Sequence, residues 1–149
     1  MVPAANSILV ILFACILMGA TQAQVTLADG PVKLSLCPDS PNCVSSQSAD
    51  KAHFIQPLHY SGSPADARQK LIAILEGMNR VRLAKVETDY IHAEFRSIVF
   101  RFVDDVKFWF TPDQPIIHIK SASRKGYYDF GANRRRVERL REAFEKLGK

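Results

Sequence analysis

Between residues 81 and 121 the chain alternates short apolar stretches with links of hairpin length, and this pattern constrains its fold most. In residues 90–96, Ile91, Ala93 and Phe95 alternate with polar side chains, as in a strand buried on one face. Other strands are expected at residues 54–60, 81–86, 116–121 and 100–110, the last as one strand or as two divided at Asp104-Asp105. Links this short favour antiparallel pairing, because parallel strands need long crossovers.

Two helices are predicted around these strands. Ser63-Pro64-Ala65-Asp66 supplies a capping serine, a proline for the first turn and an acid, and Gly77 supplies a stop. The second helix is expected at residues 133–147, with an apolar stripe made of Val137, Leu140, Phe144 and Leu147. The order β-α-β-β-β-β-α predicts a single α+β domain, an antiparallel sheet of about five strands with both helices on one face.

The N-terminal segment predicts export. Residues 1–23 carry no charged side chain and contain an apolar run from Ile8 to Ala20. Such a run, ending in small residues, is typical of a signal peptide cleaved after Ala23, and it is shorter than the ~20 residues of a membrane-spanning helix. An uncleaved anchor and lipidation at Cys15 stay open as alternatives. We therefore expect a signal peptide at 1–23, an irregular lead-in at 24–35 and the domain at 36–149, in the periplasm or outside the cell.

Cys37 and Cys43 are the cysteines of the expected mature chain. A close pair in an oxidising compartment predicts a disulfide. Reduced or redox-active thiols are one alternative and metal ligands another. A zinc site usually adds a second cysteine pair or histidines to a closer first pair, so no metal and no cofactor are predicted.

Positive charge is concentrated at the C-terminal end. Residues 24–123 contain eleven Lys and Arg against eleven Asp and Glu, whereas residues 124–149 contain nine against four. The whole formal excess of +5 therefore lies in the last segment, which approaches and forms the second helix. Arginines at the start of a helix are unfavourable unless a carboxylate or an anionic ligand lies beside them.

Asp104-Asp105 is the candidate partner for those arginines. In a regular strand the two side chains point to opposite faces, so they cannot serve as a matched acid–base pair. An inward aspartate needs a cation, because an unpaired buried charge is costly. We expect that cation to be Arg124 or one of the arginines at 134–136. A ligand-binding carboxylate and a solvated turn are the alternatives.

A candidate anion site lies in the same region. We expect six polar residues to converge with the backbone amides of loop 126–131 on a phosphate or carboxylate: Ser121, Ser123, Arg124, Asn133, Arg134 and Arg136. In the alternative interpretation Asp129 or Asn133 caps the helix, the serines belong to turns and the arginines face solvent. No phosphate-loop or dinucleotide spacing is present in the sequence.

Other chemistries have weaker support. His92, Glu94 and His118 can host a metal only if several strand registers agree, so surface histidines are the simpler expectation. The sequence has no Gly-x-Ser-x-Gly motif that would mark a nucleophilic serine. An exported protein rarely meets nucleic acid, and the basic helix needs its apolar stripe for the core. We therefore expect no nucleic-acid partner and, at most, peripheral contact with a membrane.

Three polar motifs carry a family resemblance: Cys37-Pro-Asp-Ser-Pro-Asn-Cys-Val-Ser-Ser46, Phe100-Arg-Phe-Val-Asp-Asp-Val106, and Ser121-Ala-Ser-Arg124 followed by Asn133-Arg-Arg-Arg136. The chain resembles the uncharacterised DUF1499 proteins of bacteria and plastids over residues 36–147. The resemblance implies a small exported or lumenal domain and no particular reaction. Because the shared motifs are polar rather than apolar, it also suggests a polar site.

Three functions follow as expectations. The first is a non-enzymatic exported domain that binds an anionic small molecule or lipid headgroup at the Arg/Ser/Asn site. The second is a hydrolase or isomerase that uses Asp104 or Asp105 as acid–base and Arg124 as electrostatic stabiliser. The third is a structural or assembly factor whose polar cluster only specifies the fold. Nothing in the sequence identifies a protein partner.

Overall fold

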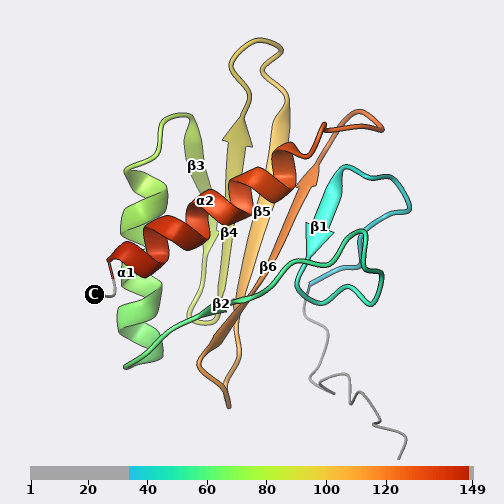
Figure 1. The fold of residues 1–149 in the computed structure, drawn as a ribbon. Coiled ribbons are helices and arrows are strands. Elements are labelled where there is room, and N and C mark those ends of the chain that lie inside the picture. Colours follow the sequence, from blue (N-terminus) through green and yellow to red (C-terminus); the bar gives the residue numbers. More distant parts are fainter. Residues whose placement is uncertain (1–33, 148–149) are drawn as a thin grey trace, which may run out of the picture. The chain divides into compact units, whose positions relative to one another are not determined.

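The computed structural model describes residues 34–147, so the expected signal peptide, Cys15 and nearly all of the expected lead-in lie outside the described residues. The elements, labelled in Figure 1, are β1 (Cys43–Ser45), β2 (Leu58–His59), α1 (Pro64–Glu76), β3 (Val81–Val86), β4 (Tyr90–Arg96), β5 (Val103–Phe110), β6 (Ile116–Ser123) and α2 (Ala132–Lys146). No helix within this part of the chain is long and apolar enough to cross a bilayer.

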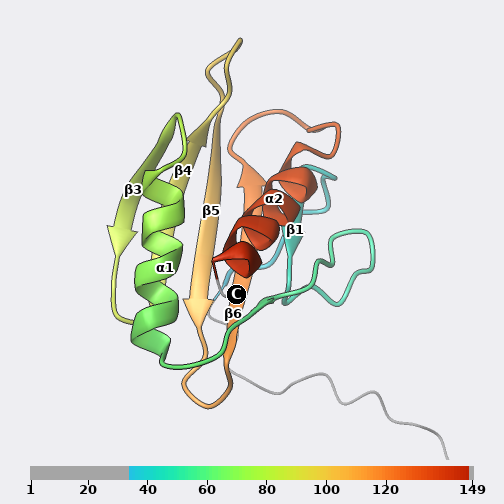
Figure 2. The ribbon, with the colours of Figure 1, turned by 60° about the vertical axis from the view of Figure 1, so that its left-hand side comes forward.

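The strands form one open antiparallel sheet in the order β1-β6-β5-β4-β3, and β2 pairs with the other half of β6. Both helices lie on the same face of this sheet (Figures 1 and 2). Between them and the sheet lies the core, which includes Leu71, Val106, Ile119 and Leu140, each fully buried. The predicted α+β class, with an antiparallel sheet and two helices on one face, is confirmed.

The N-terminal half of the sheet differs from the prediction. A strand was expected at residues 54–60, but only Leu58–His59 pairs with β6, and Phe54 forms an isolated bridge with Ser45. Pro57 lacks the N–H that a strand ladder needs, which explains the short pairing. The segment around Cys43–Ser45 was expected to be irregular and is instead β1. The sheet therefore has six strands rather than about five, in the order β-β-α-β-β-β-β-α.

β5 runs without interruption through Asp104 and Asp105, which settles the open choice between one strand and two. Its partners continue on both sides, with Asp105 opposite Glu94 of β4 and Ala122 of β6. Aspartate is depleted in strands, and a carboxylate that leaves solvent needs a cation. Here each carboxylate meets an arginine, as described below, so the backbone ladder continues.

The structure contains both predicted helices, and one residue of the predicted apolar stripes, Leu147, is not buried. Ser63 is the N-cap of α1: its hydroxyl accepts a hydrogen bond from the Asp66 N–H at 3.1 Å, and Gly77 follows the last turn. In α2 the predicted stripe holds for Val137, Leu140 and Phe144, which are buried. Leu147 was expected in that stripe and is 63% exposed, because α2 ends at Lys146 and the chain leaves the core there.

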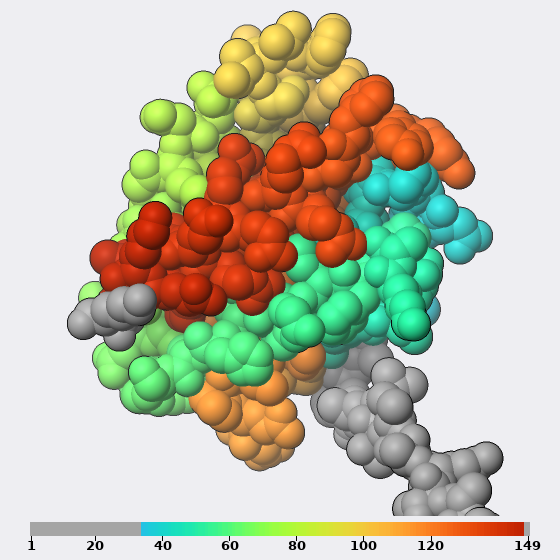
Figure 3. Space-filling view, in the orientation of Figure 1, coloured from blue at the N-terminus to red at the C-terminus, as the bar shows by residue number. Residues whose placement is uncertain are grey.

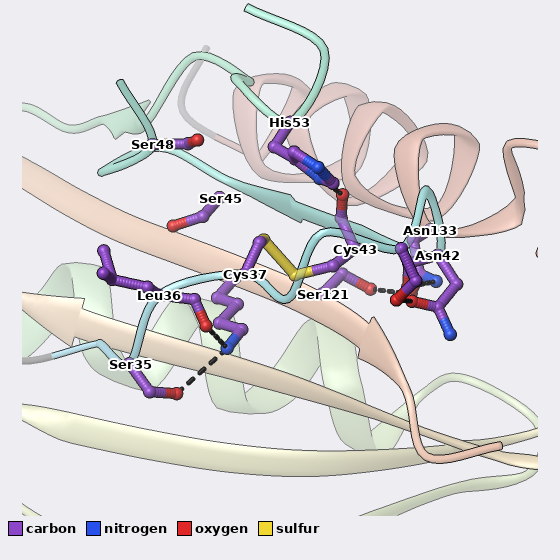
Figure 4. The surroundings of a disulfide bond; sticks show 12 residues. Ser35, Leu36, Cys37, Asn42, Cys43, Ser45, Ser48, His53, Ser121 and Asn133 are labelled. Carbon is purple, nitrogen blue, oxygen red and sulfur yellow. Dashed lines mark hydrogen bonds between the residues drawn. A yellow bond between two sulfur atoms is a disulfide. The ribbon is translucent and has the colours of Figure 1, made fainter. Parts of the chain in front are cut away.

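The predicted disulfide is present between Cys37 and Cys43, whose Cα atoms lie 5.7 Å apart. It holds residues 34–37 against the sheet face that the helices leave open (Figure 4). There the Lys120 ammonium donates to the Ser35 hydroxyl at 2.9 Å and to the Leu36 carbonyl at 2.8 Å. Burial lowers the pKa of Lys120, with the repulsion of Lys107 adding to the effect.

Candidate functional site

Asp104 and Asp105 point to opposite faces of the sheet, as predicted from strand alternation. The Asp104 carboxylate lies on the helix-covered face and pairs with the guanidinium of Arg136. The Asp105 carboxylate lies on the open face and pairs with Arg124 through two hydrogen bonds of 2.8 and 2.7 Å. The expected network of aspartates and arginines is therefore split into two, one on each face.

The inner network is a buried polar cluster made of Asn42, Asp104, Ser121, Asn133 and Arg136. Asn133 is at its centre and has no exposed surface. Its amide oxygen accepts from the Ser121 hydroxyl at 2.6 Å and from Arg136 at 2.7 Å, and its amide nitrogen donates to the Asn42 carbonyl at 2.8 Å. The Ser121–Asn133 contact, beside the disulfide, is visible in Figure 4. Each of the three polar sequence motifs contributes a residue to this polar cluster.

Two neighbours complete the polar cluster. The Ser123 hydroxyl accepts from the Asn133 amide at 3.0 Å, and the Asp129 carboxylate accepts from the Asn133 N–H at 2.8 Å. The Arg136 guanidinium also lies 5.1 Å from the centre of the Phe95 ring, a distance typical of a cation–π contact. These polar atoms all bond to one another or to the backbone. The polar cluster therefore joins β1, β5, β6 and α2 from inside the fold.

The outer network consists of Arg82, His92, Glu94, Asp105 and Arg124, all on the open face of the sheet. Arg124 contacts Glu94 at 2.5 Å as well as Asp105, and Arg82 contacts the other Glu94 oxygen at 2.7 Å. The His92 ring lies 2.6 Å from Asp105. Cross-strand register explains the arrangement, since Arg82, Glu94 and Asp105 lie opposite one another on β3, β4 and β5.

The outer network keeps its carboxylates ionised. Burial alone would raise the pKa of Asp105, but the hydrogen bonds from Arg124 and His92 outweigh it and hold the pKa below its usual value. Hydrogen bonds from Arg124 and then Arg82 lower the pKa of Glu94. The same two carboxylates raise the pKa of Arg124. A carboxylate held in this way is a weak general acid or base near neutral pH.

The structure brings together four of the six residues predicted for an anion site. Ser121, Ser123, Asn133 and Arg136 meet in or beside the polar cluster. Arg124 lies on the opposite face of the sheet. Arg134 extends to the loop before β2, where it donates to the carbonyls of Phe54 and Ala52, each at 2.8 Å. Anion binding by these six residues stays a prediction, and their hydrogen-bonding groups already have partners in the protein.

The strand registers place His92, Glu94 and His118 on the open face of the sheet, as the metal-site alternative required. Residues 34–147 nevertheless contain no group of three or more His, Cys, Asp or Glu side chains that could hold a metal ion. His118 stacks on Trp109, with ring centroids 5.6 Å apart, and its Nδ1 lies 3.0 Å from the Ser46 hydroxyl. The same hydroxyl accepts a hydrogen bond from the Ile119 N–H at 2.9 Å. Burial lowers the pKa of His118, which favours its neutral form.

A pocket of about 330 Å³ lies where β3 and β5 begin and β4 ends. We call it the arginine pocket, because its lining consists of four arginines, one acid and two valines: Arg80, Arg82, Arg96, Arg101, Glu94, Val81 and Val103. Glu94 connects it to the outer network, since the same side chain pairs with Arg82 and Arg124. Within the described part of the chain, no ion pair forms with Arg80, Arg96 or Arg101. The arginine pocket therefore carries excess positive charge.

Sequence reasoning missed the arginine pocket because its arginines belong to a region of balanced charge. Residues 24–123 are neutral overall, and the acids that balance these arginines lie elsewhere in the fold. The hairpin turn gives no better signal, because the register it sets, with Val86 opposite Ile91, shifts by one residue between Leu83 and Lys85. Only this irregularity brings Arg82 opposite Glu94 and Arg80 beside Arg96.

Comparison with known proteins gives a family and no activity. A model of the family described as "Protein of unknown function (DUF1499)" matches residues 33–144. The match spans all three polar motifs and every helix and strand described above, apart from the last residues of α2. No curated protein is significantly similar to the chain.

Proposed function

Since the chain belongs to the DUF1499 family of proteins of unknown function, we propose its function from its own geometry: it is an exported domain that binds an anionic ligand without transforming it. The observation that carries the proposal is the arginine pocket, whose lining contains four arginines and only one acidic residue. Arginine forks bind phosphate and carboxylate groups through paired, charge-assisted hydrogen bonds.

The arginine pocket is a better binding site than the polar cluster. In the polar cluster, Ser121 and Asn133 have no exposed surface, and Arg136 is paired with Asp104. A ligand there would have to displace protein hydrogen bonds of equal quality. In the arginine pocket, Arg80 and Arg96 are exposed and have no ion pair within residues 34–147. The predicted residue Arg124 lies next to this pocket, because it pairs with Glu94 of the pocket lining, but its own charge is offset by Glu94 and Asp105.

Backbone conformation also supports a role for the arginine pocket. Arg80 and Arg101 both have positive φ angles, of 62° and 53°. Such a conformation costs about 1–3 kcal/mol for a residue other than glycine and is found preferentially at functional sites. Both residues line the same pocket. This supports the interpretation that their backbone conformation is retained because it places their side chains at the pocket, and not because it stabilises the fold.

Export is part of the proposal. A Cys37–Cys43 disulfide is compatible with an oxidising compartment outside the cytoplasm, where such bonds persist. The apolar segment before Ala23 agrees with this location. A periplasmic or extracellular protein meets soluble phosphates, carboxylates and lipid headgroups, all of which suit the arginine pocket.

The two alternative functions have less support. A hydrolase or isomerase using Asp105 needs a carboxylate free to exchange a proton, and Asp105 is engaged by Arg124 and His92. If the protein were an assembly factor whose polar residues only specify the fold, the polar cluster would be explained. That function would not explain a pocket lined by four arginines.

The test is thermal unfolding of the full chain with inorganic phosphate or citrate, followed by calorimetric titration. We expect either anion to stabilise the wild type, by about 2.7 kcal/mol at one hundred times its dissociation constant. The variant Arg80→Gln with Arg96→Gln should lose most of this stabilisation, because it removes two cations of the arginine pocket.

The matched control is Lys51→Gln with Arg139→Gln, which removes two exposed cations away from the pocket. Phosphate also stabilises proteins without binding to them, and that effect is the same in every variant. The proposal is wrong if neither anion stabilises the wild type beyond the pocket variant, or if the control loses as much as the pocket variant does.

A further inference from the structure

Two loops at one end of the sheet expose apolar side chains that the core does not use. We call them the apolar tips; they comprise Ile98, Val99, Phe100 and Phe102 before β5, and Tyr127, Tyr128 and Phe130 before α2. Their exposed fractions run from 49% for Phe102 to 80% for Phe130. Monomeric soluble proteins seldom leave so many large apolar side chains together in water without an interaction that uses them.

Sheet topology places both apolar tips at the same end. β4 and β6 each pair antiparallel with β5, so they run in the same direction and their C-terminal ends lie side by side across it. The loop after β4 and the loop after β6 therefore leave the sheet at one edge. Figures 1 and 2 show both loops projecting at this end, and Figure 3 shows them as the yellow and orange protrusions of the surface.

Each apolar tip is organised locally. The rings of Phe100 and Phe102 stack with centroids 5.5 Å apart, and those of Tyr128 and Phe130 meet at the same distance. Phe130 has a positive φ of 52°, and the carbonyl of Phe130 accepts a 2.7 Å hydrogen bond from Arg135. The outward position of this ring is thus maintained by the backbone and by α2, at a cost in local strain.

The charges beside the apolar tips are mainly positive. Arg101 lies between Phe100 and Phe102, and Lys125 precedes Tyr127. The arginine pocket, with Arg101 in its lining, opens at the same end of the sheet. Asp129 is the acid of the two loops, and its carboxylate is turned toward the N–H groups of Gly131 and Asn133, each at 2.8 Å.

We propose that this end of the domain docks on an anionic bilayer surface, with the apolar tips entering the headgroup region and the neighbouring arginines contacting lipid phosphates. Aromatic side chains favour the membrane interface, and basic groups beside it gain from the negative surface potential. A bilayer fits better than a protein partner, because the apolar groups stand on two projecting loops rather than in a groove or on a flat face. The apolar tips lie outside the arginine pocket except for their neighbour Arg101, and the test substitutes the tips alone, so a failure of docking is distinguishable from a failure of anion binding.

The first test measures co-sedimentation of the full chain with vesicles of phosphatidylcholine and phosphatidylglycerol in equal parts. We expect the variant Phe100→Ser with Phe130→Ser to partition about tenfold or more weakly than the wild type, because it removes two rings from the interface. The matched control, Val86→Ser with Leu147→Ser, replaces two exposed apolar residues outside the apolar tips, one at the end of β3 and one just after α2. It should bind like the wild type.

The second test locates the contact, since any contribution of the N-terminal apolar segment is common to all variants. Hydrogen exchange of the full chain should slow at residues 97–102 and 124–131 when the mixed vesicles are added, and should not slow there with pure phosphatidylcholine. Unchanged exchange in both loops would overturn the proposal, as would equal partition of the tip variant and its control. Self-association of the wild type without lipid, lost in the tip variant, would assign the apolar tips to a second copy of the chain instead.

Discussion

At the scale of single residues, two neighbouring aspartates lie on opposite faces of the sheet and have different surroundings. Asp104 is 7% exposed and meets Arg136 beneath α2, whereas Asp105 meets Arg124 and His92 on the open face. The side chain of Arg136 is 12% exposed, so both partners of the inner pair are almost removed from water. Removing one charge from a buried pair leaves the other uncompensated, which costs more than breaking an exposed pair.

We therefore expect Asp104→Asn to lower the free energy of unfolding by about 3–5 kcal/mol, because Arg136 keeps its charge in a buried place. Urea unfolding, followed by the fluorescence of the single tryptophan, Trp109, measures this loss. Asp105→Asn is the matched control, and a loss of about 1 kcal/mol is expected there. Equal losses for the two variants would contradict the division into an inner and an outer network.

At the scale of elements, the start of α2 shows how the polar sequence motif works. Gly131 is the N-cap residue, has a φ of 75° and contributes no side-chain bond. The carboxylate of Asp129 takes over this function by accepting hydrogen bonds from the N–H groups of Gly131 and Asn133. Burial would raise the pKa of Asp129, but these hydrogen bonds lower it overall. An ionised carboxylate at this position also offsets the positive end of the helix, where three arginines follow.

Asp129→Ala should therefore destabilise the domain by about 1–2 kcal/mol, the usual cost of losing a helix cap. The comparison is Asp113→Ala, which removes an exposed acid from the turn before β6 and should change stability by less than about 0.5 kcal/mol. Chemical denaturation gives both values. Faster hydrogen exchange at Gly131 and Asn133 in the first variant alone would locate the loss, and unchanged exchange there would argue against the cap.

Elements with a local signal were predictable, and elements that depend on distant partners were not. Ser63, Pro64 and Gly77 mark α1 within a few residues of one another, so its bounds follow from the sequence. β1 is only three residues long and exists because Cys43, Val44 and Ser45 pair with β6, more than seventy positions later in the chain. The sequence left open whether one strand or two pass through Asp104-Asp105 for the same reason, since the arginines that stabilise those carboxylates, Arg124 and Arg136, lie far along the chain.

At the scale of the whole molecule, the titrating groups act together on stability in acid. The pKa values of Glu94, Asp105 and Asp129 are lowered in the folded protein, and so is that of His118. Each of these groups therefore binds a proton more readily in the unfolded chain. Stability must fall wherever the unfolded state takes up more protons, so all four groups weaken the fold as the pH decreases.

We expect the free energy of unfolding to decline in two stages as the pH is lowered. The first decline begins as the pH falls through about 6.5, where the unfolded form of His118 becomes charged, and the second begins near pH 4 with the carboxylates. Urea midpoints measured from pH 8 to pH 3 give the profile. His118→Asn should flatten the first stage and leave the second unchanged. A wild-type profile that is flat between pH 7 and pH 5 would contradict the burial of a neutral His118.

The candidate site was predictable in part. The opposite orientations of Asp104 and Asp105, and their arginine partners, followed from strand alternation and the cost of buried charge. The arginine pocket did not, because Arg80 and Arg101 belong to turns whose geometry the sequence leaves undetermined, and their positive φ angles give no local signal. The apolar tips were missed because Phe100 and Phe102 were assigned to a strand, although the backbone pairing of β5 begins only at Val103.

The polar cluster also has a consequence for the order in which the chain folds. Its bonds connect residues that are far apart in sequence, 91 positions between Asn133 and Asn42 and 32 between Arg136 and Asp104. Closing such long loops costs chain entropy, so contacts of this kind form slowly and only after nearer ones have shortened the path. The Asn133–Asn42 contact joins α2 to the segment that leads into β1, and β1 depends on its pairing with β6. We therefore expect the buried amide of Asn133 to reach its partners late in folding, after the sheet has acquired its register.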